Sequence, residues 1–336
     1  MTTNRANINF LQAFHSVVRS VLELSGFEWE LRRAGDARMG LWRRKLKPAQ
    51  ITAGRFVLIP GFGDTSAAWM TIVSALIPLL SRAGYSEIVV LDFPGYSGFL
   101  SEEKFYPSVD LLVSATQDVL DSLEPHTILG HSLGGWLTAR YASDCGNGSR
   151  PKIQRKFGYT GPKKIFLISP AGGYLNENIR GNVEEVFKKM VNGEGLNAVR
   201  PHLFNQEPFW FKFLARDFNH FSSEENVKLF VESVTPEFGS ADHLQFIQAK
   251  SWLIWGDKDT LTPTQSMPLW MSHLSKSPGG VPQAVVLKNV GHSPHIEAMP
   301  ATLALLGQFL FEKSPHPRGD RWWRSVTSFE PNTTEI

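Results

Sequence analysis

The residue that most directly suggests chemistry is Ser132, in the segment 130–135 (GHSLGG), between an apolar run and a helix-like stretch. A serine at such a turn adopts a strained backbone costing about 1–3 kcal/mol, which proteins accept mainly where the geometry has a use. Gly130 and Gly134 have no Cβ atoms, so strand and helix can approach closely and leave the hydroxyl accessible. The pattern predicts a nucleophile, which in turn requires a base, an acid and oxyanion donors.

The predicted base is His292. It follows an apolar run at 284–287 that reads as a strand, comes directly after Gly291, and precedes Pro294, which can begin a helix. His295 is the nearest alternative, but we expect it in the first turn of that helix and pointing elsewhere. The alternative without chemistry is a histidine satisfied by loop hydrogen bonds.

The predicted acid is Asp259, three residues beyond Gly256 and after the strand-like run 251–255. At that distance the chain has turned over the end of the sheet, whereas Asp257 remains near the strand and can cap the turn. The acid would hold the imidazole in the correct tautomer and stabilise its cation. The three groups therefore follow the chain order Ser132, Asp259, His292.

An oxyanion hole needs backbone N–H groups about 3 Å from the developing charge. One such group normally belongs to the residue after the nucleophile, which here is Leu133. The second is expected from Phe62, because Gly61 and Gly63 on either side free its N–H to face a ligand. A plain turn is the alternative for this segment.

These motifs, taken in order, resemble the α/β-hydrolase superfamily, specifically its lipase- and esterase-like members with an inserted cap. The resemblance covers about residues 50–312. The matching segments are 60–63 with Trp69 downstream, 91–98, 130–135, 255–259, and 291–292 leading to Glu297 and Pro300. The chain departs from the pattern at Pro60, where relatives often have a histidine that steadies the oxyanion loop. Proline fixes its own φ, so we expect the loop to be held differently here.

The resemblance implies an α/β fold with a mostly parallel central sheet flanked by helices. It also implies hydrolysis of a carboxylic ester through an acyl-enzyme, with no metal or organic cofactor. Two alternatives stay open. One is a carbon–carbon bond hydrolase of the meta-cleavage product type, which uses the same three groups. The other is a non-catalytic binding protein of the same fold, although such relatives usually lack one of those groups.

The sequence predicts one catalytic unit with an insertion. Residues 51–172 and 243–313 are assigned to the hydrolase core, 173–242 to a helical cap rich in aromatic residues, and 314–336 to a tail. Residues 1–50 are expected to form an amphipathic helix and a basic hairpin that join the core. The aromatic residues of the cap either line an apolar substrate pocket or form the core of the cap itself.

Composition narrows the expected partners. The net charge of +2 and the lack of a nucleic-acid-binding motif argue against nucleic acid, leaving a small-molecule ester or lipid-like substrate. The single cysteine excludes an intrachain disulfide and suits the cytoplasm. The N-terminal helix and basic hairpin are also suited to peripheral contact with an anionic membrane. The sequence does not determine the oligomeric state.

Overall fold

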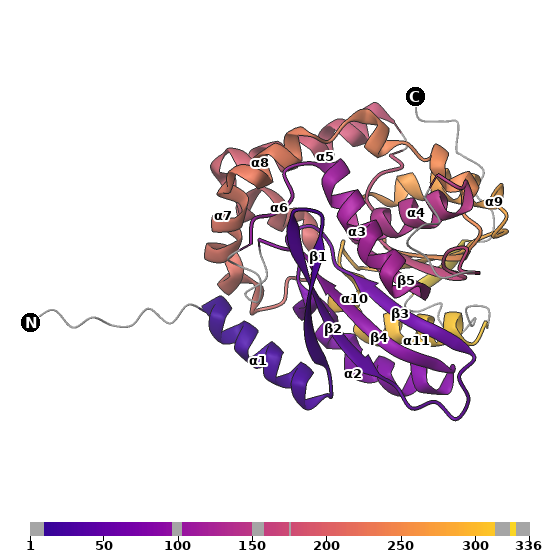
Figure 1. Ribbon diagram of the computed structural model, residues 1–336. Helices are drawn as coiled ribbons and strands as arrows, with labels where there is room; N and C mark the ends of the chain where they lie inside the picture. The colour runs from indigo at the N-terminus through magenta and orange to yellow at the C-terminus, as the bar shows by residue number, and fades with distance from the viewer. Residues whose placement is uncertain (1–9, 96–102, 150–157, 175, 313–322, 327–336) are drawn as a thin grey trace, which may run out of the picture.

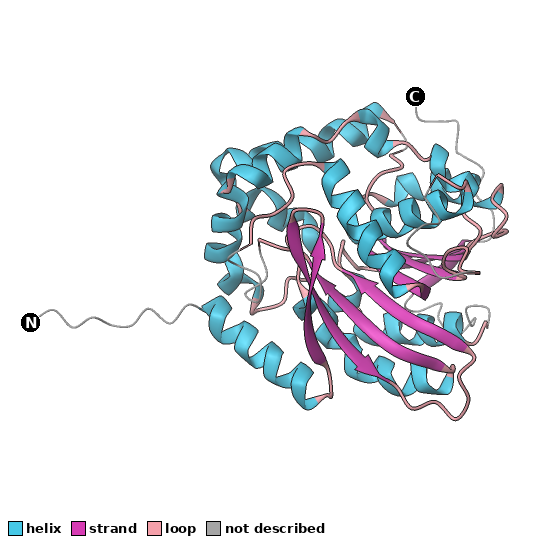
Figure 2. Ribbon diagram, viewed as in Figure 1, coloured by secondary structure: helices cyan, strands magenta, loops and turns pink. Residues whose placement is uncertain are grey.

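The computed structural model describes residues 10–95, 103–149, 158–174, 176–312 and 323–326. Its centre is a single sheet with helices packed on both faces (Figures 1 and 2). Parts of the sequence interpretation lie outside the described residues: 1–9 of the N-terminal segment, 96–102, 150–157, 175 of the expected cap, and all of the expected tail except 323–326. No helix within the described ranges has the length and apolar character needed to cross a membrane.

The sheet has nine strands in the order β1-β2-β4-β3-β5-β6-β7-β8-β9 among the described residues. The pairs from β4 through β8 are parallel, and the pairs β1/β2, β2/β4 and β8/β9 are antiparallel. The strands are β1 (Glu28–Ala34), β2 (Ala37–Lys45), β3 (Ala53–Ile59), β4 (Tyr85–Asp92), β5 (Pro125–His131), β6 (Lys164–Ile168), β7 (Lys250–Gly256), β8 (Gln283–Leu287) and β9 (Trp323–Val326). The predicted mostly parallel sheet is confirmed.

The central strands are nearly continuous runs of branched apolar residues, as expected for parallel strands covered on both faces. In β3, the segment Phe56–Ile59 is fully buried, and so is Ile165–Ile168 in β6. One face of the sheet is covered by α1 (Phe10–Leu24), α2 (Ser66–Arg82), α10 (Pro294–Glu297) and α11 (Met299–Leu310). The other face is covered by α3 (Val109–Leu123), α4 (Leu133–Gly146) and α9 (Met267–Ser275).

Local capping signals set where the helices begin. Thr65 caps α2, its side chain accepting a hydrogen bond from the Ala67 amide at 3.1 Å. Ser108 caps α3 in the same way, accepting from the Leu111 amide at 3.3 Å. Helix α3 ends at Glu124, which has a left-handed backbone. These caps fix the loops that enter both helices.

Between β6 and β7 the chain leaves the strand–helix alternation. The α-helices here are α5 (Glu177–Lys189), α6 (Leu196–Leu203), α7 (Ala215–Ser223) and α8 (Glu225–Glu232). Short turns connect them: η2 (Met190–Glu194), η3 (Phe211–Leu214), η4 (Pro236–Gly239) and η5 (Asp242–Phe246). In Figure 1 α5 to α8 lie along one end of the molecule, above the rim of the sheet. The stretch 209–218 is not one helix, because it divides into η3 and the start of α7.

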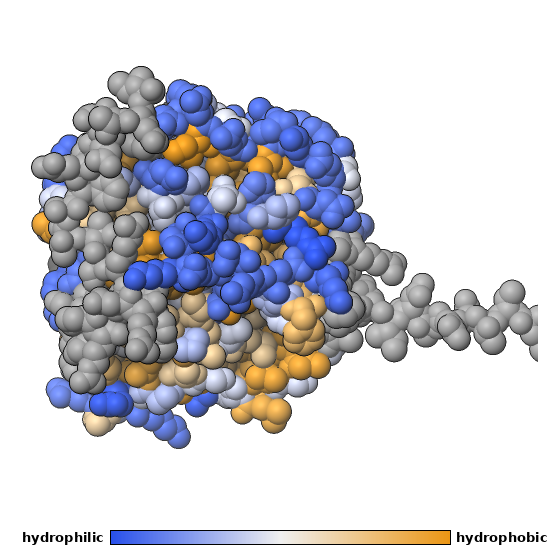
Figure 3. Space-filling model, turned by 180° about the vertical axis from the view of Figure 1, so that it is seen from behind, coloured by the Kyte–Doolittle hydropathy of each residue, from blue (hydrophilic) through white to orange (hydrophobic). Residues whose placement is uncertain are grey.

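The N-terminal hairpin adds an antiparallel edge, with Ala34 opposite Ala37 and Leu41 opposite Leu91. Its positive charges are partly paired, because Arg43 forms ion pairs with Glu30 at 2.7 Å and with Glu87 at 2.8 Å. Seen from behind the view of Figure 1, the molecule has hydrophilic side chains across its centre and apolar ones in smaller groups (Figure 3).

Candidate active site

Ser132 occupies the turn between β5 and α4. Its backbone has φ 51° and ψ −118°, a conformation that few residues other than glycine adopt. The flanking glycines are required by contact: a Cβ on Gly134 would lie 2.3 Å from the Ile59 carbonyl oxygen, and one on Gly130 would lie 2.2 Å from the Gly134 carbonyl oxygen. The tight strand–turn–helix geometry expected from the sequence is therefore present.

Asp259 and His292 lie at the carboxyl ends of β7 and β8, two neighbouring strands. His292 Nδ1 and Asp259 Oδ2 are 3.0 Å apart, and their side chains are 1% and 0% exposed. Burial shields this pair from water, so its hydrogen bond is directional and strong. The backbone of His292 is also fixed, because its N–H donates to the Leu203 carbonyl of α6 at 3.1 Å.

Thr262, which was not among the predicted site residues, holds the Asp259 carboxylate. The Thr262 hydroxyl lies 2.9 Å from Asp259 Oδ2 and 3.1 Å from His292 Nδ1. The amides of Leu261 and Thr262 both donate to Asp259 Oδ1, at 3.0 and 2.9 Å. An aspartate followed three residues later by threonine is a local signal for such side-chain-to-backbone bonds and could have indicated this turn.

Ser132 and His292 line the same cavity, together with Phe62. A Cβ on Gly61 would lie 3.3 Å from the Ser132 Cβ, so the turn that carries Phe62 passes directly beside the serine. Leu133 is the first residue of α4, and the first N–H groups of a helix have no partner within it. The two amides expected to serve as oxyanion donors thus belong to segments on either side of Ser132.

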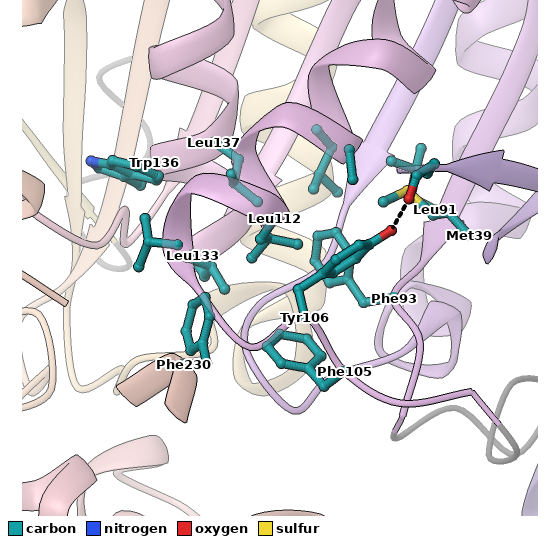
Figure 4. Close-up of a cluster of buried hydrophobic side chains, with 14 of the residues drawn as sticks. Met39, Leu91, Phe93, Phe105, Tyr106, Leu112, Leu133, Trp136, Leu137 and Phe230 are labelled. Carbon is teal, nitrogen blue, oxygen red and sulfur yellow. Dashed lines mark hydrogen bonds between the residues drawn. The ribbon is translucent and has the colours of Figure 1, made fainter. Parts of the chain in front are cut away.

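Some aromatic residues between β6 and β7 line cavities, and others pack in the core or face solvent. Phe204, Trp210, Phe211 and Phe218 line the cavity that contains His292. Phe230 lines a second cavity that also reaches Ser132, where it lies near Leu133 (Figure 4). Others do not line either cavity: Phe221 is buried in the core, whereas Phe209 is 82% exposed.

Two carboxyl groups, one buried and one half-buried, anchor the turn before α2. Asp92, at the end of β4, accepts hydrogen bonds from the Ser66 amide and from the Trp42 indole. Asp64 accepts one from the Thr65 amide at 2.8 Å. Burial raises the pKa of each carboxyl group to about 7. Asp92 thus ties the end of β4 to the turn that leads into α2.

His131, which directly precedes Ser132 in the chain, packs against His295 with ring centroids 4.5 Å apart. His131 Nε2 bonds the His292 carbonyl at 2.9 Å, which requires that this nitrogen carry the proton. Burial holds the pKa of His131 well below its usual value and lowers that of His295 to about 3. His295 was expected to point elsewhere, but it packs against this cluster because α10 lies against α2, where His295 meets the Trp69 ring at 4.6 Å.

Among the described residues, Asp64, His131 and His295 form the group whose donor atoms could hold a metal ion, all within 4.8 Å of one another. Two imidazoles and a carboxylate are a donor set that suits zinc or iron. The chemistry of Ser132 does not require such an ion.

We expect His295→Gln to make the protein less sensitive to acid. The unfolded chain protonates His295 below about pH 6.5 and the folded chain does so only near pH 3, so stability falls as the pH drops through this window. Urea unfolding at pH 7 and pH 5 should show wild type losing about 2 kcal/mol more than the variant.

Wild type and His295→Gln differ only at residue 295, so the difference between their losses of stability measures the contribution of the His295 imidazole. The raised pKa of Asp64 acts in the opposite direction, since its contribution to stability is present below pH 3.8 and is lost as the pH rises through about 7. Equal losses in wild type and His295→Gln on acidification would contradict the prediction.

Residues 56–305 match the family model described as "Alpha/beta hydrolase family". The chain belongs to this family, and its sheet order agrees with that assignment. A search of curated proteins by sequence gives no match.

Similar solved structures include lipases and esterases. A putative lipase from Acinetobacter baumannii AYE is 20% identical with a TM-score of 0.66, covering 89% of this chain and 96% of its own. A membrane phospholipase A described as a bacterial virulence factor is 20% identical with a TM-score of 0.62, covering 91% and 92%. The carboxylesterase CesB from Bacillus subtilis is 16% identical with a TM-score of 0.59, covering 89% and 98%.

Proposed function

We propose that this hydrolase cleaves carboxylic esters with apolar substituents, using Ser132 as nucleophile, His292 as base and Asp259 as the acid that orients it. The observation that carries the proposal is the buried 3.0 Å bond between Asp259 and His292, formed beside a cavity that Ser132 and His292 line together. A strained serine, a buried imidazole and a fully hydrogen-bonded carboxylate at one rim of a sheet are the parts that acyl transfer needs.

In the proposed reaction, His292 removes the Ser132 proton as the hydroxyl oxygen attacks the ester carbonyl carbon. The amides of Phe62 and Leu133 donate to the oxyanion of the tetrahedral intermediate. As the intermediate collapses, the carbon–oxygen bond to the leaving alcohol breaks, and His292 gives its proton to that oxygen. Water then attacks the acyl-enzyme with His292 again as base, which releases the carboxylic acid and restores Ser132.

Asp259 contributes by holding His292 in the tautomer that keeps the proton on Nδ1 and leaves Nε2 free to accept. Thr262 supports this by donating to the Asp259 carboxylate. The walls of the cavities favour an apolar substrate, since most of the side chains contributed by α5, α6 and α8 are aliphatic or aromatic. Esterases and lipases among the similar structures agree with an ester as substrate.

The proposal predicts stoichiometric labelling by a serine-directed phosphonate and turnover of nitrophenyl esters of short to medium acyl chains. Mass spectrometry should place the label on Ser132, and the labelled protein should be inactive. A chromogenic dienoate of the meta-cleavage type is the comparison substrate. Preferential turnover of the dienoate would replace the ester assignment with carbon–carbon bond hydrolysis, and a lack of labelling would favour a non-catalytic binding protein.

A further inference from the structure

Two largely apolar cavities, not one, meet at Ser132. The first lies beneath α6 and α7 and contains His292; its walls include Val199, Phe204 and Trp210. The second lies between α5 and α8, and its walls include Val183, Val231 and Phe238. Among the described residues, four line both cavities: Phe62, Ser132, Phe187 and Leu261. The nucleophile therefore stands at a junction with an apolar arm on each side.

An aromatic wall separates the arms. Phe62, from the turn before α2, meets Phe187 of α5 edge to face at a centroid distance of 5.7 Å. Phe62 also stacks on Phe230 of α8 at 5.4 Å with nearly parallel rings. Rings packed in this way are worth more than their buried area alone and hold one another in place. A substrate that fills both arms must therefore bend around this wall, with its reacting carbon next to Ser132.

The position of His292 distinguishes the arms chemically. His292 and Ser293 line the first cavity and are not among the described residues that line the second, whereas Leu133 and Thr262 line only the second. The base that receives the serine proton must pass it to the leaving oxygen, so the leaving alcohol has to lie on the side of His292. The acyl chain then extends in the other direction, past the Leu133 amide.

The structure points to a two-armed substrate: we propose that the leaving alcohol occupies the first cavity and the acyl chain the second, so that the preferred esters are apolar on both sides of the carbonyl. This assignment rests on the proposed function above. It extends that function by giving each cavity its part of the substrate, and it predicts that the two chain-length preferences can be changed independently.

The charges at the rim of the second cavity fit an uncharged acyl chain. Arg180 Nε lies 3.3 Å from a Glu184 carboxylate oxygen, and Lys188 lies 3.9 Å from the other. Arg180 is also paired with Glu177. Because these cations already have carboxylate partners, an anionic group on the acyl chain would have to compete for them, while an alkyl chain contacts only the apolar walls.

Two matched substitutions test the assignment. Val183 and Val199 are both buried helical valines, 5% and 3% exposed, and each lines one cavity only. We would measure kcat/KM by pH-stat for wild type, Val183→Phe and Val199→Phe. One substrate series varies the acyl group, from ethyl acetate to ethyl decanoate. The other varies the alcohol, from methyl acetate to decyl acetate.

Val183→Phe is expected to lower kcat/KM for ethyl octanoate about tenfold relative to ethyl acetate. The larger side chain should displace one to two methylenes of the acyl chain, and each methylene that loses its apolar site costs about fourfold. Octyl acetate should change less than twofold relative to methyl acetate. Val199→Phe should give the converse result. Val183→Ala and Val199→Ala, which enlarge the same arms, should shift the corresponding optimum to longer chains and provide the test if a phenylalanine variant does not fold.

The reversed pattern, or the same loss in both series for either variant, overturns the assignment of arms. This result differs from failure of the proposed function. If wild type hydrolyses neither series, or if Ser132→Ala hydrolyses them as well as wild type, the esterase proposal itself is wrong. If hydrolysis depends on Ser132 but the two series respond alike, only the two-armed assignment is lost.

Discussion

Ser132→Ala is expected to lower kcat for ester hydrolysis by about 10⁶-fold while changing KM little, because the variant has no nucleophile but keeps both cavities intact. The measurement is steady-state hydrolysis of a nitrophenyl ester under conditions where wild type turns over rapidly. Ser251→Ala is the matched control: Ser251 is a buried serine whose hydroxyl donates to the Ala249 carbonyl, far from the proposed site. This control should retain activity within a few-fold.

Ser132→Gly separates loss of chemistry from loss of folding. At φ 51° and ψ −118°, the backbone strain at this position is relieved by glycine but not by alanine. Ser132→Gly should therefore be at least as stable as Ser132→Ala in urea unfolding, and as inactive. Residual activity above about 1% of wild type in either variant would rule out Ser132 as the nucleophile.

The fold could be predicted from sequence because its signals are local and repeated. Continuous apolar runs such as 56–59 and 165–168 indicate buried parallel strands, and Gly130 and Gly134 indicate a close approach of strand and helix. Each predicted site residue follows such a run, and the carboxyl ends of parallel strands lie at one edge of a sheet. The bond between Asp259 and His292 joins residues 33 positions apart in sequence and agrees with this reasoning.

The features that sequence did not reveal depend on non-local packing. Strand β9 comes from the expected tail and pairs with β8, a contact that periodicity cannot encode. His295 was expected to point elsewhere, but it stacks near Trp69 and His131 because of how α10 crosses α2. The helices between β6 and β7 bury their apolar faces on both the core and the cavities, so spacing alone could not assign those faces.

The two cavities also depend on non-local packing, so the sequence did not predict them. The motifs around Ser132, Asp259 and His292 are short and predict a reaction type, whereas the substrate is determined by side chains from α5, α6 and α8 that share no motif. Val183 and Val199 look alike in the sequence, and only the path of the chain assigns them to different cavities. Reaction chemistry and specificity are thus encoded at different levels of the structure.

Asp259→Asn is expected to lower kcat about 10⁴-fold without unfolding the protein. The amides of Leu261 and Thr262 both donate to Asp259 Oδ1, so the carbonyl oxygen of an asparagine must take that position. Its NH₂ group then faces His292 Nδ1 at the place of Oδ2. Because this group donates, Nδ1 has to accept, the proton moves to Nε2, and the imidazole can no longer receive the proton of Ser132.

Asp257→Asn supplies the control, because Asp257 is the other carboxylate after β7. It is exposed and accepts a hydrogen bond from the Asn289 amide at 2.7 Å, which an asparagine oxygen can also do. Its kcat should stay within about fivefold of wild type, since an exposed hydrogen bond contributes about 1 kcal/mol or less, which corresponds to about fivefold in rate at most. Because the two aspartates are only two positions apart, a larger loss in Asp257→Asn than in Asp259→Asn would reassign the acid and with it the orientation of His292.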